Sequence, residues 1–268
     1  MMASGVIGKP VSHSIGQYIY NILFDRYSID SIYLSVDLDE NNIKRFINYS
    51  KKAFTGFNIT APYKETVMSY LDDVDLTAKN IGSVNLVKNI SGRLYGYNSD
   101  YNGFLFLLKN NNVNLNGKNV LVLGTGGIAK TIIHAIENNY NSNIAIVTRD
   151  ISSKKFDLKT IGYDDIDDYD VIINCTPVGM GNNENMPVNE NKIKEGITGI
   201  DVIYNPQETK FLKTVKGRNG IAVNGSDLFI GQGIETLKKL YNINIDYSKF
   251  KNLFYEKINK WIAFNYLW

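Results

Sequence analysis

Short apolar runs alternate with amphipathic segments along the first hundred residues of the chain. Strand-like runs cover 5–8, 31–38 and 56–60, and helix-like spacing of apolar residues begins at Ile15 and at Asn41 between them. Such an alternation predicts βαβ units, which build a mostly parallel sheet. The remaining elements expected in this half are two strands and an amphipathic helix, at 83–88, 94–97 and around 104–108.

The same alternation starts again after a polar stretch at 109–117, which is either a linker or a helix end followed by a loop. Residues 118–123 form a buried-strand pattern that leads directly into glycine. After Asp227, apolar residues keep helical spacing to the end of the chain, and we expect these helices to pack back on the first half. The later strands are predicted at 143–148, 171–175, 199–203 and 221–224.

The length of 268 residues suits two domains of ordinary size. We expect an α/β protein in which residues 1–100 and 236–268 form a mostly parallel α/β domain. Residues 101–235 are expected to form a Rossmann-type dinucleotide-binding domain. Two domains imply a ligand cleft between them.

A further helix is predicted directly after the strand at 56–60. Pro62 suits the first turn of a helix, which we expect to run through Lys64 towards Leu71. Lys64 is therefore expected at a helix start beside a strand end.

Composition and charge exclude several classes of partner. The 29 basic and 27 acidic residues leave a net charge of +2, too small for a field that holds a nucleic-acid backbone or an anionic membrane. The N-terminal residues lack a signal-peptide pattern, and no run of about 18 apolar residues suits a membrane span. We expect a cytoplasmic protein. Its single cysteine, Cys175, lies in an apolar run and is expected to be a buried strand residue rather than a nucleophile.

A glycine-rich turn follows the predicted strand at 118–123. Gly124, Gly126, Gly127, Ile128 and Ala129 belong to a G-x-G-x-x-A pattern, which lets a pyrophosphate approach a helix N-terminus. The alternative is an ordinary tight turn, because glycine-rich turns between strands and helices are common.

The end of the next predicted strand bears on the choice of cofactor. In this fold an acidic residue about twenty positions after the glycines selects NAD, and an arginine accommodates the 2′-phosphate of NADP. Thr148 is neutral and Arg149 is cationic, so the sequence favours NADP, with Lys154 as a possible second cation. Asp150 either weakens that preference by repelling the phosphate or points away from it.

Polar side chains gather at strand ends in the first half, in clusters at 12–14, 58–60 with Lys64, 84–85 and 98–100. The carboxyl ends of strands line the ligand crevice of an open α/β sheet, so these positions suit the binding of a small hydroxylated molecule. The alternative is helix capping, for which Thr60 and Asp100 are both suitable, and either residue could serve both purposes.

Eight motifs in order make the chain resemble the shikimate dehydrogenase family over nearly its whole length. Gly56 to Lys64 and Gly96 to Asp100 are two of the motifs that carry this resemblance. Residues 103–104 belong to the second of these motifs, and the other six lie at 8–10 with 13–14, 84–85, 124–129, 174–180, 201–206 with Thr209, and Gly225 with Gln232.

The resemblance implies an enzyme that reversibly reduces 3-dehydroshikimate to shikimate with NADPH, acting on small molecules as a monomer or homodimer. It implies no metal. The site residues that it implies are Lys64 and Asp100 at the reacting oxygen, Thr60, Asn85 and Gln232 at the ring hydroxyls, Ser14 and Tyr204 at the carboxylate, and the turn at Gly124 with Thr148, Arg149 and Leu228 at the cofactor.

Departures from the family pattern leave two alternatives open. Gly16 and Gln17 stand where the family usually has a second carboxylate-binding serine followed by proline, which weakens binding unless Gln17 or water substitutes. A quinate or mixed quinate/shikimate dehydrogenase using NAD(P) is therefore one alternative, and a non-catalytic nucleotide-binding relative is the other. His13 is expected to serve packing or loop geometry rather than catalysis.

Overall fold

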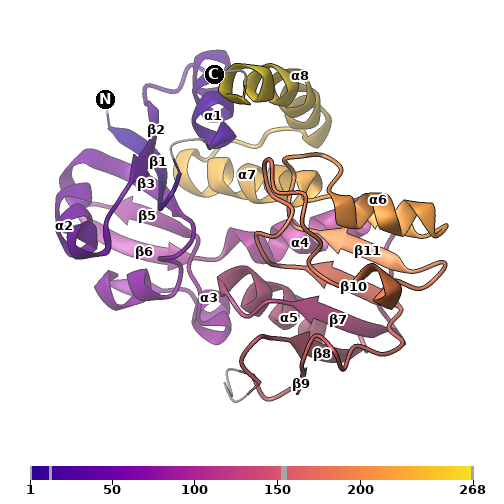
Figure 1. Ribbon diagram of the computed structural model, residues 1–268. Coiled ribbons are helices and arrows are strands. Elements are labelled where there is room, and N and C mark those ends of the chain that lie inside the picture. The colour runs from indigo at the N-terminus through magenta and orange to yellow at the C-terminus, as the bar shows by residue number, and fades with distance from the viewer. Residues whose placement is uncertain (1, 12–13, 152–155, 267–268) are drawn as a thin grey trace. The chain divides into compact units, whose positions relative to one another are not determined.

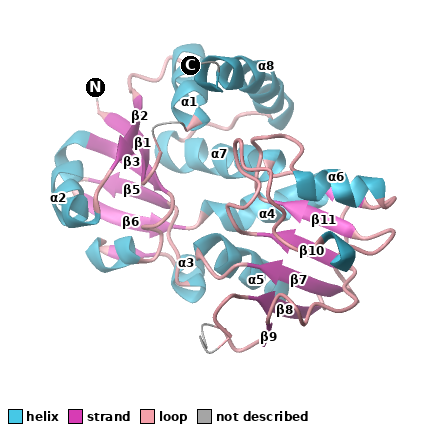
Figure 2. Ribbon diagram, viewed as in Figure 1, coloured by secondary structure: helices cyan, strands magenta, loops and turns pink. Residues whose placement is uncertain are grey.

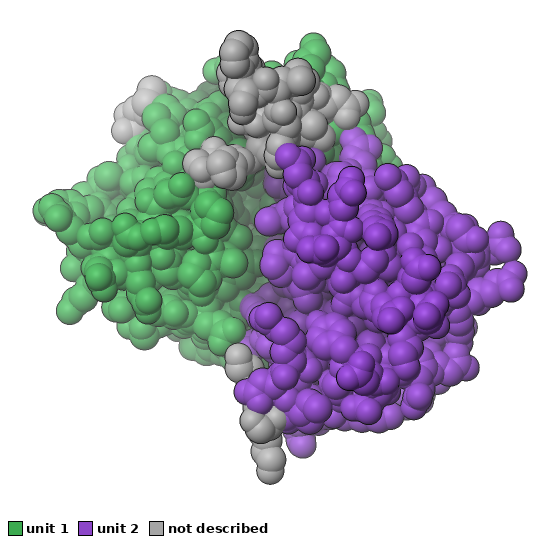
Figure 3. Space-filling view, viewed as in Figure 1, with its two compact units in different colours: residues 1–99, 232–268 green, residues 100–231 purple. Residues whose placement is uncertain are grey.

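The computed structural model describes residues 2–11, 14–151 and 156–266, which divide into two compact units. Unit 1 comprises residues 1–99 and 232–268, and unit 2 comprises residues 100–231 (Figure 3). The boundary falls inside two helices, α4 (Ser99–Asn110) and α7 (Ser226–Tyr241). In the described part of the chain no helix combines the length and the apolar character that a membrane span requires.

A mixed six-stranded sheet forms the centre of unit 1 (Figure 1). Its order is β2-β1-β3-β5-β6-β4, and β1 pairs in parallel with both β2 and β3. Strand β5 is antiparallel to both β3 and β6. Ser91 and Gly92 join β5 to β6 in a two-residue hairpin turn with positive φ at both positions. The strands are β1 (Ala3–Gly8), β2 (Tyr33–Asp37), β3 (Phe54–Ile59), β4 (Asp73–Val74), β5 (Leu86–Ile90) and β6 (Arg93–Tyr97).

Helices cover both faces of this sheet, and alternate residues of β3 face different helices. Phe57 and Ile59 belong to a buried apolar cluster that includes residues of α2 and α3. Gly56 and Asn58 point the other way, where they meet Leu240 and Thr236 of α7. The helices of this unit, besides α7, are α1 (Ile15–Arg26), η1 (Glu40–Asn42), α2 (Ile43–Ala53), η2 (Thr66–Tyr70), α3 (Leu76–Ile81) and α8 (Tyr247–Tyr266).

The helix predicted from Pro62 through Lys64 to Leu71 is wrong. Residues 61–65 form a turn, and only the 3-10 helix η2 follows. The reason is a tertiary hydrogen bond, because the Lys64 carbonyl accepts from the Val84 amide at 2.8 Å instead of from Met68. Met68 bonds to the Glu65 carbonyl, which is the i to i−3 pattern of a 3-10 turn.

Unit 2 is a doubly wound parallel sheet with helices on both faces (Figure 2). Val120 and Val122 pack into a cluster with α4 and α5, whereas Leu121 and Leu123 pack into a second cluster with α6. The strand order is β12-β11-β10-β7-β8-β9, and every pairing is parallel. The elements, besides α4 and the start of α7, are β7 (Asn119–Leu123), α5 (Gly127–Asn139), β8 (Asn143–Val147), β9 (Lys159–Ile161), β10 (Val171–Asn174), η3 (Glu190–Lys192), β11 (Thr198–Asp201), α6 (Lys210–Gly217) and β12 (Ile221–Val223).

The predicted fold class is confirmed, since both units are α/β and unit 2 has the Rossmann arrangement. The short edge strand β9 was missed, because its three residues are too few to show a pattern. A strand was predicted at 83–88, where β5 lies, but its antiparallel direction was not predicted.

Candidate active site

The loop after β1 leads to helix α1, and Ser14 begins that helix. The Ser14 hydroxyl accepts a hydrogen bond from the Gly16 amide at 3.2 Å, so Ser14 is the N-cap of α1. Gln17 lies in the first turn of α1, where its Oε1 accepts from the Ser35 amide at 2.8 Å. Its carboxamide oxygen is thus occupied by the edge strand β2. His13 lies outside the described residues.

Thr60 and Lys64 lie just beyond the carboxyl end of β3. The Thr60 amide donates to the Ile7 carbonyl at 2.9 Å, which continues the pairing of β3 with β1 past the end of the strand. Lys64 is half-buried, and its carbonyl is held by the Val84 amide. Thr60 does not cap a helix, because the 3-10 helix that follows has Glu65 at its N-cap.

Asn85 joins the end of β3 to the start of α4. It is 3% exposed, and its Oδ1 accepts from the Ser99 amide at 2.6 Å while its Nδ2 donates to the Ser99 hydroxyl at 3.0 Å. Asp100 directly follows Ser99 in the first turn of α4, and its side chain is 5% exposed. The helix already begins at Ser99, so Asp100 is not its N-cap. Val84 and Asn85 together therefore hold Lys64 and the residue that precedes Asp100.

The glycine turn of unit 2 has the form that a dinucleotide phosphate requires. Gly124 has φ of +104°, and a Cβ there would lie 3.1 Å from Thr176 Cγ2. Gly126 is the N-cap of α5 without a side-chain capping bond, so the first amides of a 13-residue helix are open to an anion. Ile128 is half-buried and Ala129 is buried within the first turn of α5. The residues fit a bound pyrophosphate, and this favours the nucleotide interpretation over an ordinary tight turn.

Thr148 and Arg149 directly follow β8, where the fold reads the adenosine ribose. The Thr148 hydroxyl accepts from the Asp150 amide at 3.2 Å, which turns the chain sharply at this point. Arg149 is exposed and lies near Tyr163, where its charge opposes the rise that burial causes in the pKa of the Tyr163 phenol. Lys154 lies outside the described residues.

A buried carboxylate connects the ends of β10 and β11 with the start of α6. Asp201 accepts from the Thr209 hydroxyl at 2.8 Å, and from Asn174 Nδ2 and the Ile203 amide at 3.1 Å each. The desolvation that comes with burial raises the pKa of Asp201 to about 6, although these three hydrogen bonds lower it. Tyr204 comes three residues later, and its ring centroid lies 4.9 Å from that of Phe229.

The comparisons with known proteins agree on one family. The shikimate dehydrogenase substrate binding domain matches residues 6–87. The shikimate dehydrogenase (NADP(+)) of Thermoplasma acidophilum is 39% identical over 263 residues, which are 96% of each chain. The chain belongs to the shikimate dehydrogenase family. The resemblance found in the sequence motifs is thereby confirmed.

Solved structures of this family have the same fold. Shikimate dehydrogenase 1 from Peptoclostridium difficile matches with a TM-score of 0.91 and 31% identity over 97% of this chain and 99% of that one. A shikimate dehydrogenase crystallised with NADP+ matches with a TM-score of 0.88 and 32% identity over 96% of both chains.

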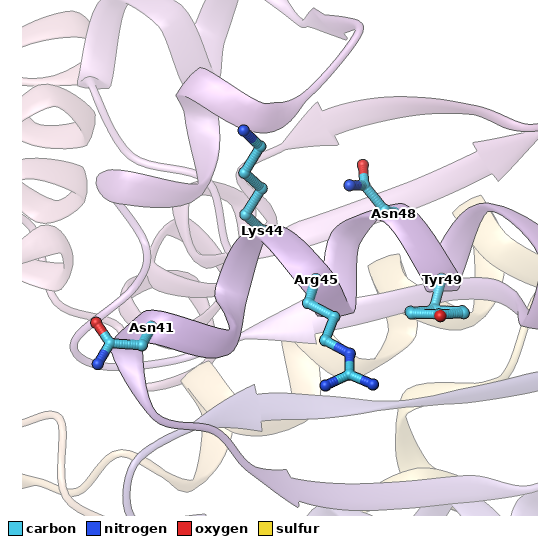
Figure 4. A pocket seen from close by; sticks show the side chains of 5 residues that line it. All are labelled: Asn41, Lys44, Arg45, Asn48 and Tyr49. Atoms are coloured by element: carbon cyan, nitrogen blue, oxygen red, sulfur yellow. The ribbon is translucent and has the colours of Figure 1, made fainter.

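Among the other predicted positions of this shikimate dehydrogenase family member, Leu228 and Cys175 are buried in the core of unit 2. Burial raises the pKa of the Cys175 thiol, so it is inert, as its apolar surroundings in the sequence suggested. The cofactor role of Leu228 stays a prediction. A shallow surface hollow elsewhere is lined by side chains of η1 and α2 and includes none of the predicted site residues (Figure 4). The described residues contain no group of three His, Cys, Asp or Glu that could hold a metal.

The sequence interpretation gave no role to the Asp201 network or to Thr236, and it placed Asn58 only in the polar cluster at the end of a strand. Asn58, Asn174 and Asp201 lie inside family motifs, and that position was the available signal. Thr236 had none, because a single threonine in a helical pattern carries no information about its partner.

The pKa of Asp201 predicts a pH dependence of stability. Its ordinary value is 3.8, so the folded state holds this proton more tightly than the unfolded state does. The resulting stabilisation is complete below about pH 4, is lost as the pH rises through about 6, and amounts to roughly 3 kcal/mol. Asp201→Asn should remove this slope in urea unfolding measured across that range.

The matched control is Asp168→Asn, an exposed carboxylate that should follow wild type at every pH. If the difference in unfolding free energy between wild type and Asp201→Asn is the same at all pH values, the raised pKa is wrong.

Proposed function

We propose that this chain is a shikimate dehydrogenase that interconverts 3-dehydroshikimate and shikimate with NADP(H). The observation that carries the proposal is the 39% identity to a shikimate dehydrogenase (NADP(+)) across 96% of the chain, with Lys64 and Asp100 both present in their motifs. Unit 1 would bind the substrate, which is supported by the match of residues 6–87, and unit 2 would bind the cofactor.

NADPH held at the glycine turn of Gly124 would supply the hydride for the carbonyl carbon of the substrate. Lys64 stabilises the negative charge that develops on the carbonyl oxygen and donates the proton that completes the hydroxyl. Asp100 orients the ammonium group and the substrate hydroxyl. The main-chain links through Val84 and Asn85 support this pairing, because they hold Lys64 and the residue before Asp100 in the same unit.

The remaining residues bind and orient the substrate. We assign the ring hydroxyls to Thr60, Asn85 and Gln232, and the substrate carboxylate to Ser14 and Tyr204. Gly16 leaves the carboxylate end one hydroxyl short. This residue is the specific observation that keeps quinate as a second candidate substrate.

A spectrophotometric assay of shikimate and quinate, each with NADP+ and NAD+, tests the proposed function directly. We expect the highest kcat/KM for shikimate with NADP+. A higher kcat/KM for quinate with NAD+ would favour the second candidate, and no turnover in any combination would favour a non-catalytic relative.

The cytoplasmic location and the monomeric or homodimeric state stay predictions. The single buried cysteine is consistent with the cytoplasmic location. The net charge of +2 argues against nucleic acid as a partner. Light scattering coupled to size-exclusion chromatography distinguishes the two assembly states.

Replacing Lys64 by alanine removes the proposed proton donor. We expect kcat to fall by at least about a hundredfold, the usual scale for a lost general acid, with a smaller change in the shikimate KM. Steady-state kinetics measure both, and Lys79→Ala, which removes an exposed lysine of the same unit, is the control. Turnover like that of wild type would remove Lys64 from the mechanism.

Replacing Arg149 by alanine removes the proposed contact with the 2′-phosphate. NADPH carries that phosphate and NADH does not, so we expect the KM for NADPH to rise at least about tenfold more than that for NADH. Lys213→Ala removes an equal charge from an exposed position of unit 2 and should leave the ratio unchanged. Equal losses for both cofactors in Arg149→Ala would show that this residue does not read the phosphate.

Replacing Gly16 by serine should restore the missing hydroxyl. A Cβ at Gly16 would lie 3.1 Å from the Ser14 hydroxyl, a contact that a shift of a few tenths of an ångström relieves. A charge-assisted hydrogen bond contributes about 1.5 to 3 kcal/mol, so we expect the shikimate KM to fall by at least about tenfold. Gly16→Ala gives at least as large a gain in helix propensity without the hydroxyl, so it separates the two effects. An equal KM in both variants would mean that no carboxylate lies there.

A further inference from the structure

A chain of buried hydrogen bonds joins helix α7 to strand β3 inside unit 1. The Thr236 hydroxyl accepts from Asn58 Nδ2 at 3.1 Å and donates to the Gln232 carbonyl at 2.9 Å. Asn58 Oδ1 accepts from the Tyr33 hydroxyl at 2.8 Å, and its Nδ2 also donates to the Asn85 carbonyl at 3.3 Å. Asn58, Thr236 and Tyr33 are all buried. The carboxamide of Asn58 thus links the main chains of Asn85 and, through Thr236, of Gln232.

The apolar contacts of α7 do not by themselves define its position along and around its axis. Leu237 and Leu240 are buried on this helix, and aliphatic packing tolerates small rotations and shifts. A hydrogen bond has one favourable geometry, and a buried donor left without a partner costs about 1 to 3 kcal/mol. The bond from Asn58 to Thr236 therefore selects a single register for α7 against β3.

Close packing at Gly233 restricts the same turn of the helix. A Cβ at this position would lie 2.8 Å from the ring of Phe250 and 3.3 Å from the Tyr20 hydroxyl. Tyr20 in turn stacks on Tyr33, with ring centroids 4.3 Å apart. Gln232 immediately precedes Gly233 and lies one turn before Thr236. The packing at Gly233 and the hydrogen bond from Thr236 therefore both restrict the main chain at Gln232.

We propose that Thr236 is a positioning residue for the substrate, acting through Gln232. Its hydroxyl couples the register of α7 to Asn58 and so directs the Gln232 carboxamide towards a ring hydroxyl of the substrate. The inference rests on the proposed function, in which Gln232 binds that hydroxyl. Thr236 itself does not touch the substrate.

Thr236→Val tests this role, because valine keeps the shape of threonine and removes the hydroxyl. We expect the shikimate KM to rise about tenfold, which corresponds to about 1.4 kcal/mol, while the KM for NADP+ changes less than about twofold. Thr236→Ser keeps the hydroxyl and should restore the wild-type KM. Should valine prevent folding, Thr236→Ala removes the hydroxyl without adding bulk.

The matched control is Tyr241→Phe, which removes hydrogen bonds between the far end of α7 and Ser4 and Ser31. This variant weakens the attachment of the same helix without touching the link to Gln232. Its thermal midpoint should fall as far as that of Thr236→Val, and its shikimate KM should stay at the wild-type value. Equal KM changes in both variants would reduce Thr236 to a purely structural residue.

A double-mutant cycle with Gln232→Ala decides the route of the effect. If Thr236 acts through Gln232, Thr236→Val should not change the shikimate KM further once the Gln232 carboxamide is gone. An additive effect of the two changes, or an unchanged KM in Thr236→Val alone, overturns the inference. Failure of the proposed function itself has a different signature, because wild type would then not oxidise shikimate.

Discussion

Two consecutive residues, Val84 and Asn85, carry the hydrogen bonds on which the candidate site of unit 1 depends. The Val84 amide donates a hydrogen bond to the Lys64 carbonyl and thereby prevents a regular helix after β3. The Asn85 side chain accepts a hydrogen bond from the amide of Ser99, the first residue of α4, which directly precedes Asp100. Because both bonds come from adjacent residues, the proposed acid and the residue that precedes its carboxylate partner are attached to the same short piece of main chain.

Buried polar side chains also connect neighbouring elements by hydrogen bonds elsewhere in the two units. Asn58 connects β2, β3 and α7, and Asp201 connects β10, β11 and α6. Each has several partners within hydrogen-bond distance, which offsets the cost of removing it from water. Asp201 remains costly to ionise in spite of three donors, as its raised pKa shows. Such groups define one arrangement of the elements where apolar packing alone permits several.

Glycine serves the cofactor end in a different way. Gly124 has a positive φ at the end of β7, where a Cβ would press on Thr176, and the uncapped N-terminus of α5 follows directly. The affinity for an anion therefore comes from main-chain amides that any sequence with this turn provides. We assign the choice between NADP and NAD to side chains such as Arg149. The glycine turn and the cofactor preference could therefore be predicted from separate parts of the sequence.

The sequence by itself determined the α/β class, the glycine turn and the family, since these depend on local periodicity and on motifs in a fixed order. It also indicated Lys64 and Asp100 as candidates, although their geometry stayed a prediction. The turn at 61–65, the antiparallel β5 and the link from Asn58 to Thr236 were decided by the tertiary structure. Thr236 follows Asn58 by 178 positions, and no local pattern specifies which donor reaches a hydroxyl at that separation. Hydrogen bonds between distant segments form only once the core has packed, so they cannot be read from either segment alone.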